Sequence, residues 1–223
     1  MDRETSGIRA TGHPLSLNLF SELQSDILRG RLKQGQKLSE QQICDRYGLS
    51  RTPVREAFRQ LELEGLIETI PNRGAFVVGL TERDIKDLFE MRKAYEILAV
   101  KWAISRITKE EREKLEEAYE FMEFYTMKKE ADKMLNINRR FHMLIYKASH
   151  NRMLEQTLST YQLYLKETES NSAYLKGHLE VVLKEHKDIF DAFKNEDPEA
   201  GASAVAIHLD NAKTRVGHFI YSS

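Results

Sequence analysis

The chain has 223 residues, of which 31% are charged and 41% hydrophobic, with a formal net charge of -1 and four prolines. This composition suits a folded, helical protein of two domains and excludes disordered and collagen-like chains. It also argues against a protein that coats nucleic acid through bulk positive charge, so any DNA binding must come from a local arrangement of arginines. No apolar run approaches the roughly 20 residues that span a bilayer, and no apolar core follows the N-terminal residues. We therefore expect a cytoplasmic protein with no membrane partner.

The first 80 residues predict a small domain of three helices and a hairpin, behind a flexible segment over residues 1–14. Apolar residues at helical spacing and a series of capping residues mark the helices, and a turn at residues 71–74 joins two short strands. The predicted elements are a helix over 15–29, a short helix between Ser39 and Gly48, a helix from a cap at Ser50 or Thr52 to about Gly65, and strands over 66–70 and 75–78. Two close helices followed by a hairpin predict a winged helix-turn-helix over residues 15–78.

From Thr81 onward the chain shows almost only helical periodicity, which places a domain boundary near residues 78–81. The predicted helices cover 81–105, 109–127, about 129–149, 153–170, about 175–194 and 198–221. The predicted fold class is thus mainly α, with the winged helix-turn-helix followed by an all-α helical bundle over residues 79–223.

The third predicted helix carries an arginine stripe beside its buried face. Its apolar residues at 54, 57, 58 and 61 define that face, and Arg51, Arg55 and Arg59 lie about 100° away from the face's centre. Arginines at the start of such a helix suit a DNA major groove, and Arg73 with Gly74 at the hairpin turn suits the minor groove or the phosphates. The alternative is a solvated face that pairs these arginines with Glu56 and Glu62.

Three segments of this region closely resemble the GntR family of bacterial regulators. They are Leu-Ser-Glu-Gln-Gln at 38–42, Leu-Ser-Arg-Thr-Pro-Val-Arg-Glu-Ala at 49–57 and Leu-Glu-Leu-Glu-Gly-Leu-Ile at 61–67. The resemblance implies a double-stranded DNA operator as partner. It further implies operator contacts from Arg51, Thr52 and Arg55, assisted by Arg59, Arg73 and Gly74. Gln41 departs from the pattern, because some relatives carry a DNA-contacting arginine there.

In the second domain, one amide and three imidazoles suggest a metal site. Asn138 and His142 are four residues apart and share a helix face, while His186 and His208 belong to two later helices. Imidazole nitrogens and an amide oxygen suit zinc, nickel or a similar divalent transition ion better than calcium or magnesium. From spacing alone the alternative is favoured, in which each histidine is a hydrogen-bonded core or surface residue.

The surroundings of these residues resemble the FCD ligand-binding domain of the FadR subfamily. The similar segments are 138–142, 185–189 and 197–208, and the resemblance covers about residues 81–220. Members of that type commonly hold a metal through one Asp and three His. The resemblance therefore implies that His142, His186 and His208 are ligands, with Asn138 in place of the aspartate.

These features together predict a homodimeric transcription regulator. We expect residues 79–223 to form the dimer and to bind the effector, a small organic acid, at the metal. Arg92 is a candidate carboxylate partner, with an ion pair to Glu96 as the alternative, and His178 is a candidate for the same pocket, with a solvated side chain as the alternative. Two other functions remain open at this point. A metal-dependent helical enzyme would use an open coordination position to activate water, and a direct metal-ion sensor would need no organic ligand.

Overall fold

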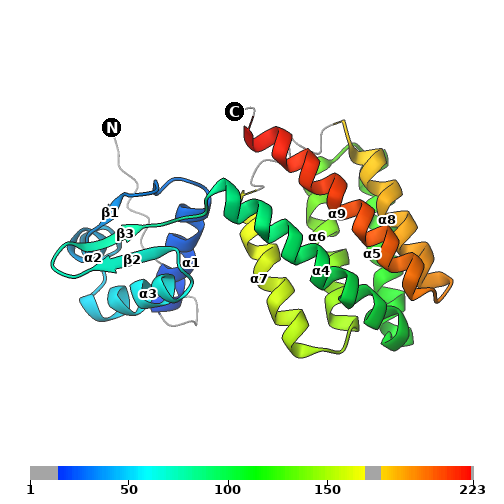
Figure 1. Cartoon of the computed structure of the whole chain (residues 1–223), viewed down its shortest axis with the longest axis horizontal. Helices are drawn as coiled ribbons and strands as arrows, with labels where there is room; N and C mark the ends of the chain where they lie inside the picture. The colour runs from blue at the N-terminus through cyan, green and yellow to red at the C-terminus, as the bar shows by residue number, and fades with distance from the viewer. Residues whose placement is uncertain (1–14, 169–176, 222–223) are drawn as a thin grey trace. The chain divides into compact units, whose positions relative to one another are not determined.

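The computed structural model describes residues 15–168 and 177–221 and divides the chain into two compact units, with the division between Glu82 and Arg83. Figure 1 shows a small unit of helices and strands, and a larger unit built of helices alone. None of the helices among the described residues has the length and apolar character needed to cross a membrane. The predicted fold class is confirmed.

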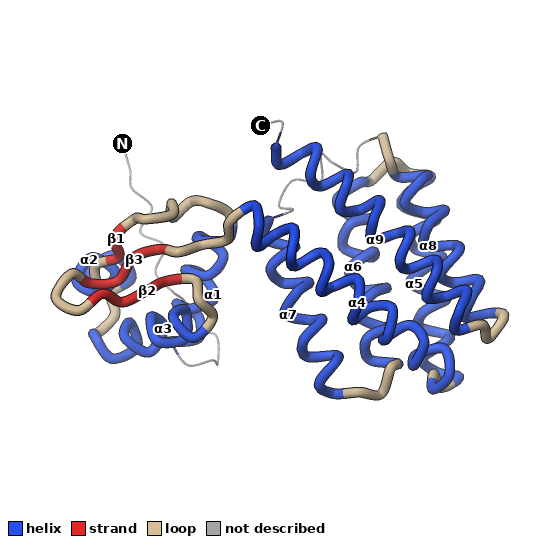
Figure 2. Tube along the Cα trace, viewed as in Figure 1, coloured by secondary structure: helices blue, strands red, loops and turns tan. Residues whose placement is uncertain are grey.

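The first unit contains three helices and a three-stranded antiparallel sheet (Figure 2). The helices are α1 (Leu15–Leu28), α2 (Glu40–Tyr47) and α3 (Arg51–Leu63), and the strands are β1 (Lys37–Leu38), β2 (Ile67–Ile70) and β3 (Gly74–Val77). The sheet order is β1-β3-β2, with Leu38 opposite Ala75 and Ile67 opposite Val77. Sequence reasoning missed β1, because two residues are too few to show the alternation that marks a strand.

Local signals fix the helix-turn-helix. The hydroxyl of Ser39 accepts a hydrogen bond from the backbone N–H of Gln42 at the start of α2, and Gly48 ends that helix in the left-handed conformation with φ 65°. The buried residues of α3 are those that the periodicity predicts, namely Val54, Ala57, Phe58 and Leu61. The opposite side of α3 is therefore free to meet a partner.

The second unit is a bundle of six helices among the described residues. They are α4 (Glu82–Arg106), α5 (Lys109–Met127), α6 (Ala131–Ala148), α7 (Arg152–Thr168), α8 (Leu179–Lys194) and α9 (Pro198–Tyr221). Helix α6 starts two residues later than expected, because Lys129 adopts φ 56°, which no α-helix continues through. The expected start of α8 near residue 175 lies outside the described residues.

The core of this unit is apolar and holds the helices that carry the predicted metal ligands. Phe141 on α6, Ile189 and Phe193 on α8 and Val205 on α9 are almost fully buried in one cluster. Helices α9 and α4 approach closely at Gly201, where an added Cβ would lie 2.5 Å from Cδ1 of Ile104. This packing sets the position of α9, and with it the position of His208.

Candidate functional site

Three buried histidines converge in the helical unit. His142 comes from α6, His186 from α8 and His208 from α9, and their side chains are at most 3% exposed. One ligand nitrogen from each ring lies within 4.8 Å of the others, and Nε2 of His142 is 3.3 Å from Nε2 of His186. Helices far apart in sequence thus bring to one point the three imidazoles that the resemblance implied.

The outward nitrogen of each ring has an acceptor. Carboxylate and carbonyl oxygens only accept hydrogen bonds, so they fix the proton on Nδ1 and leave the Nε2 lone pair directed to the centre. The three pairs are His142 with Oε2 of Glu96 at 3.0 Å, His208 with Oε2 of Glu185 at 2.8 Å, and His186 with the carbonyl of Val182 at 2.7 Å. This arrangement orients imidazoles as metal ligands.

Burial keeps the rings of His186 and His208 neutral near pH 7. It lowers the pKa of His186 well below its usual value and that of His208 to about 4, although Glu185 opposes the latter shift. Burial raises the pKa of Glu185, but hydrogen bonds from His208 and Arg215 outweigh it and lower this pKa to about 2. Neutral imidazole is the form that binds a metal ion, and the carboxylate behind it is charged.

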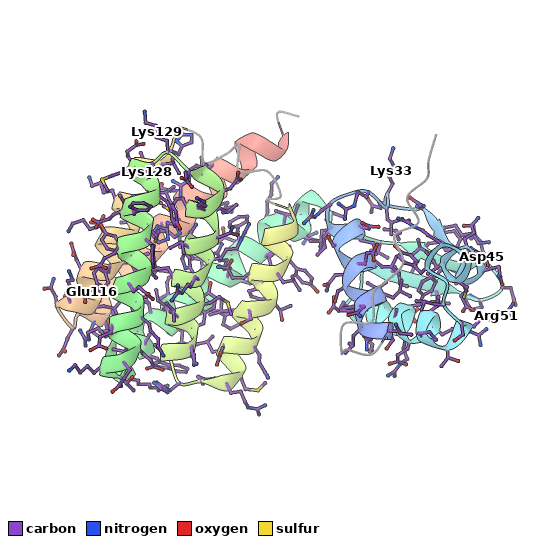
Figure 3. The ribbon with its side chains drawn as sticks, turned by 180° about the vertical axis from the view of Figure 1, so that it is seen from behind. Lys33, Asp45, Arg51, Glu116, Lys128 and Lys129 are labelled. Carbon is purple, nitrogen blue, oxygen red and sulfur yellow. The ribbon has the colours of Figure 1, made fainter. Side chains whose placement is uncertain are left out.

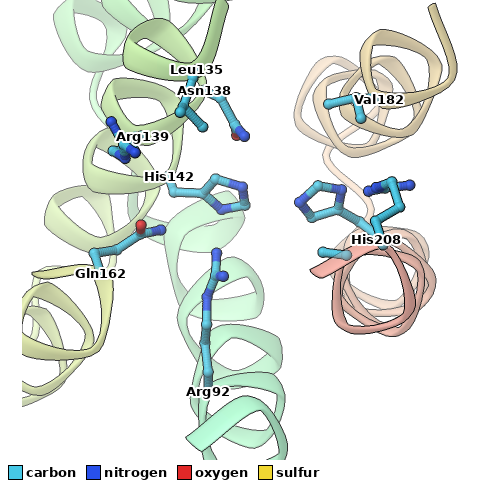
Figure 4. Close-up of a pocket in the computed structure, with 10 residues that line it drawn as sticks. Arg92, Leu135, Asn138, Arg139, His142, Gln162, Val182 and His208 are labelled. Atoms are coloured by element: carbon cyan, nitrogen blue, oxygen red, sulfur yellow. The ribbon is translucent and has the colours of Figure 1, made fainter. Parts of the chain in front are cut away.

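Asn138 supplies a further donor at the same place. Its Oδ1 is buried and has no hydrogen-bond partner among the described residues, and Asn138 lines one small cavity together with His142 and His208 (Figure 4). A buried acceptor without a donor carries a desolvation cost that a cation would remove. Three imidazole nitrogens and one amide oxygen therefore fit a divalent transition ion.

Arginines surround this cavity. It has a volume of about 20 Å³, room for roughly one water-sized group, and its polar lining includes Arg92, Arg139, Gln162 and Arg215. Arg92 rises from α4 toward His142 in Figure 4, and its Nε lies 2.5 Å from Oε1 of Glu96. Arg92 therefore lines the cavity and also forms the ion pair with Glu96 that was the alternative for it.

The other predicted pocket residue does not join the cluster. His178 is exposed at the N-cap of α8 and is absent from the cavity lining, so the solvated alternative describes its position. Sequence reasoning missed Arg139, Gln162 and Arg215. Arg139 follows Asn138 directly, so its sequence position could have placed it at the cavity. Gln162 on α7 and Arg215 on α9 reach the cavity only through the packing of the helices.

In the first unit, the predicted arginines of α3 are exposed and loosely paired. Arg55 Nε lies 2.9 Å from Glu40, Arg59 lies 3.2 Å from Glu56, and Arg51, which projects from the surface in Figure 3, lies 3.3 Å from the amide oxygen of Gln41. Thr52 is also exposed beside them. Exposed pairs of this kind are weak, so the arginines can exchange these partners for DNA.

The hairpin contributes to the same surface. Arg73 is exposed beside Gly74, whose φ of 99° disfavours any residue with a side chain. Arg55 and Arg59 of α3 line one groove of about 480 Å³ together with Arg73 and Gly74. Helix and hairpin thus line one groove that carries four basic side chains and two glutamates.

Known proteins share this architecture. The family model of the bacterial regulatory proteins of the gntR family matches residues 15–77, and that of the FCD domain matches residues 87–211. The chain is 29% identical over 208 residues to the uncharacterized HTH-type transcriptional regulator YdhC of Bacillus subtilis strain 168, covering 93% of each protein. It is 28% identical over 207 residues to the HTH-type transcriptional repressor RspR of Escherichia coli K12, covering 91% of this chain and 89% of RspR.

A solved structure supports the same fold. Escherichia coli McbR/YncC superimposes with a TM-score of 0.69 at 22% identity, covering 93% of this chain and 99% of that one. The matching families and relatives are transcription regulators and not enzymes, which removes the metal-dependent enzyme considered above. The FCD match alone spans more than half of the chain, and the gntR match covers the DNA-binding unit. The chain therefore belongs to the GntR family of bacterial transcription regulators and carries an FCD domain.

Proposed function

We propose that this regulator binds its operator as a homodimer and that a small carboxylate, bound at a metal in the FCD domain, controls its DNA affinity. The observation that carries the proposal is a cluster of three buried imidazoles, two of which line a cavity together with Asn138 and three arginines. The Asn138 oxygen there has no hydrogen-bond partner among the described residues. In this assignment Asn138, His142, His186 and His208 hold one divalent ion.

Zinc or nickel suits this donor set. Both ions accept imidazole nitrogen readily, and Glu96 and Glu185 behind two of the rings raise ligand basicity. An aspartate at position 138 would add a negative charge, whereas the amide leaves the charge of the ion uncompensated by its direct ligands. The ion would then attract an anion to any open coordination position.

A carboxylate fits this charge. Arg92 lies beside His142 in the cavity and can offer a bidentate guanidinium to a carboxylate, in exchange for Glu96. The ion would bridge α6, α8 and α9, while Arg92 belongs to α4, the first helix of the FCD domain. A ligand that contacts both the ion and Arg92 can favour one packing of these four helices over another. The change in DNA affinity would then equal the difference between the ligand's affinities for the two packings.

The homodimer follows from the size of a DNA site. One α3 with its hairpin reads few base pairs, and a two-fold axis doubles the contact on a palindrome. We assign the operator contacts to Arg51, Thr52 and Arg55, supported by Arg59, Arg73 and Gly74. Analytical ultracentrifugation of the free protein and of its operator complex tests this part, and a monomer in both would overturn it.

The deciding experiment for ligand control is a DNA-binding titration against organic acids, neutral sugars and amines. It is run with zinc-loaded protein, with metal-free protein and with His142→Ala. We expect only organic acids to change operator affinity, and only with metal bound. An uncharged effector, or equal action without metal, would contradict the mechanism.

The small cavity favours a second candidate, a direct metal-ion sensor, because about 20 Å³ leaves little space beside an ion. The zinc-only arm of the same titration separates the two functions. A full change in operator affinity on adding zinc, with no further effect of any acid, would establish the sensor.

A further inference from the structure

The three arginines that line the cavity differ in their partners. Arg92 pairs with Glu96, and Arg215 donates from Nη1 and Nη2 to the two oxygens of Glu185, each at 2.8 Å. Among the residues whose side chains the structure describes, Arg139 makes no ion pair, and its one hydrogen bond there goes to the amide oxygen of Asn136 at 3.3 Å. Arg139 is thus the cavity arginine that has no carboxylate partner among the described side chains.

The guanidinium of Arg139 is also partly enclosed. Its Nε is buried and lacks a hydrogen-bond partner among the described residues. A buried donor of a charged group without an acceptor carries a larger cost than a neutral one, and an anion in the cavity would remove that cost. The structure therefore contains a place for a negative charge that no described side chain fills.

This place adjoins the proposed metal ligands. Arg139 follows Asn138 directly and precedes His142 by three residues on α6, so Arg139 and His142 occupy neighbouring positions on the helix surface. All three line the same cavity. A ligand anchored at the ion therefore has Arg139 within the reach of a short carbon chain.

We propose that the effector is a small dicarboxylate, with one carboxylate at the ion and the second paired with Arg139. This inference rests on the proposed function and narrows its ligand class. Arg92 would give up Glu96 to meet the carboxylate at the ion, and Arg215 is held by both oxygens of Glu185. Arg139 can therefore meet a second anionic group without losing an ion pair to a described side chain. The cavity of about 20 Å³ holds roughly one water-sized group, so the proposal requires the half-buried Arg139 side chain to move outward as the ligand enters.

The test compares succinate with butyrate, which has four carbons but a single carboxylate. Binding to zinc-loaded full-length protein is measured by calorimetry for the wild type, Arg139→Gln and Arg140→Gln. Arg140 is the matched control, because it is exposed, pairs with Glu117 at 2.7 Å and does not line the cavity. Zinc content is measured for each protein.

We expect the wild type and Arg140→Gln to bind succinate about tenfold or more tightly than butyrate, as one charged hydrogen-bonded pair implies. Arg139→Gln should bind both acids nearly equally. Equal affinities in the wild type would overturn the dicarboxylate while leaving the proposed function intact, and a preserved preference in Arg139→Gln would overturn the role of Arg139. Failure of every acid to bind would instead defeat the proposed function. The wild-type comparison needs no variant, so it decides the ligand class even where Arg139→Gln loses zinc.

Discussion

Oε2 of Glu185 lies 2.8 Å from Nδ1 of His208, and both side chains are more than nine-tenths buried. The same carboxylate accepts from Asn211 and Arg215, so three donors fix its position. Glu185 in turn fixes the ring of His208 with Nε2 directed inward. It therefore acts as a positioning residue for the proposed metal centre, although it does not itself face the ion.

Glu185→Gln should weaken metal binding without abolishing it. The amide keeps an acceptor for His208 but loses the negative charge, and loss of such outer partners typically costs about 10- to 100-fold in metal affinity. Competition with a zinc-binding dye measures the change. Glu180→Gln, an exposed change on the same helix, is the control. Unchanged affinity in Glu185→Gln would contradict this role.

Each of His142→Ala, His186→Ala and His208→Ala should deplete the metal from purified protein, while the wild type carries close to one ion per chain. Losing one imidazole from so small a ligand set removes much of the affinity, and thermal stabilisation by added zinc should disappear with it. Elemental analysis and melting curves check both outcomes. His150→Ala is the control, since His150 is exposed and pairs with Glu111 outside the cluster. Wild type that neither carries metal nor melts higher with zinc would remove the metal assignment.

Arg55→Ala should weaken operator binding by roughly 1 to 3 kcal/mol, the usual effect of removing a base-contacting arginine. Arg55 is exposed on α3, and its partner Glu40 is exposed too, so the loss should appear in DNA affinity and not in folding. Fluorescence anisotropy with operator and with scrambled DNA measures it. Arg152→Ala removes an exposed arginine from the helical unit and should leave affinity unchanged. Equal effects of the two substitutions would argue against the assignment.

Metal-free protein should lose stability as the pH falls from 6.5 to about 4. Burial lowers the pKa of His208 from 6.5 to about 4, so in this range the unfolded chain takes up a proton that the folded protein does not. The neutral His208 ring therefore contributes roughly 3 kcal/mol to the free energy of unfolding above pH 6.5, and this contribution is lost as the pH falls to about 4. Urea unfolding at a series of pH values measures the free energy of unfolding. This free energy should fall less steeply with decreasing pH in His208→Gln than in the wild type. Identical slopes would show that another group controls the acid sensitivity.

Gly201→Ala should destabilise the protein, although alanine favours helices by up to about 1 kcal/mol. The new Cβ would lie 2.5 Å from Cδ1 of Ile104, and overpacking of a core usually costs about 1 to 3 kcal/mol. Ile104→Val removes that methyl group. In the Ile104→Val background Gly201→Ala should therefore be neutral or stabilising in urea unfolding, and an unchanged penalty there would rule out this contact as the cause.

The sequence by itself determined most of the elements and much of the surface that we propose contacts DNA. The cap at Ser39, the stop at Gly48 and the buried face of α3 are local signals, since they depend on residues within one or two helical turns. Resemblance then indicated which arginines we assign to the operator. Strand β1 was not predicted, because it forms only by pairing with the distant strand β3, with Lys37 opposite Phe76.

For the metal centre, sequence spacing placed only Asn138 and His142 on one face of one helix. Periodicity shows which side of a helix is buried, but it does not fix the rotation and offset of one helix against another, which depend on the packing of the whole core. The tertiary structure therefore decided that Glu96 and Glu185 stand behind two of the histidines and that Arg139 and Arg215 line the cavity. The tertiary structure also decided that His178 is exposed. His178 is the N-cap of α8, and this helix directs His186 inward while its N-terminal end lies in solvent.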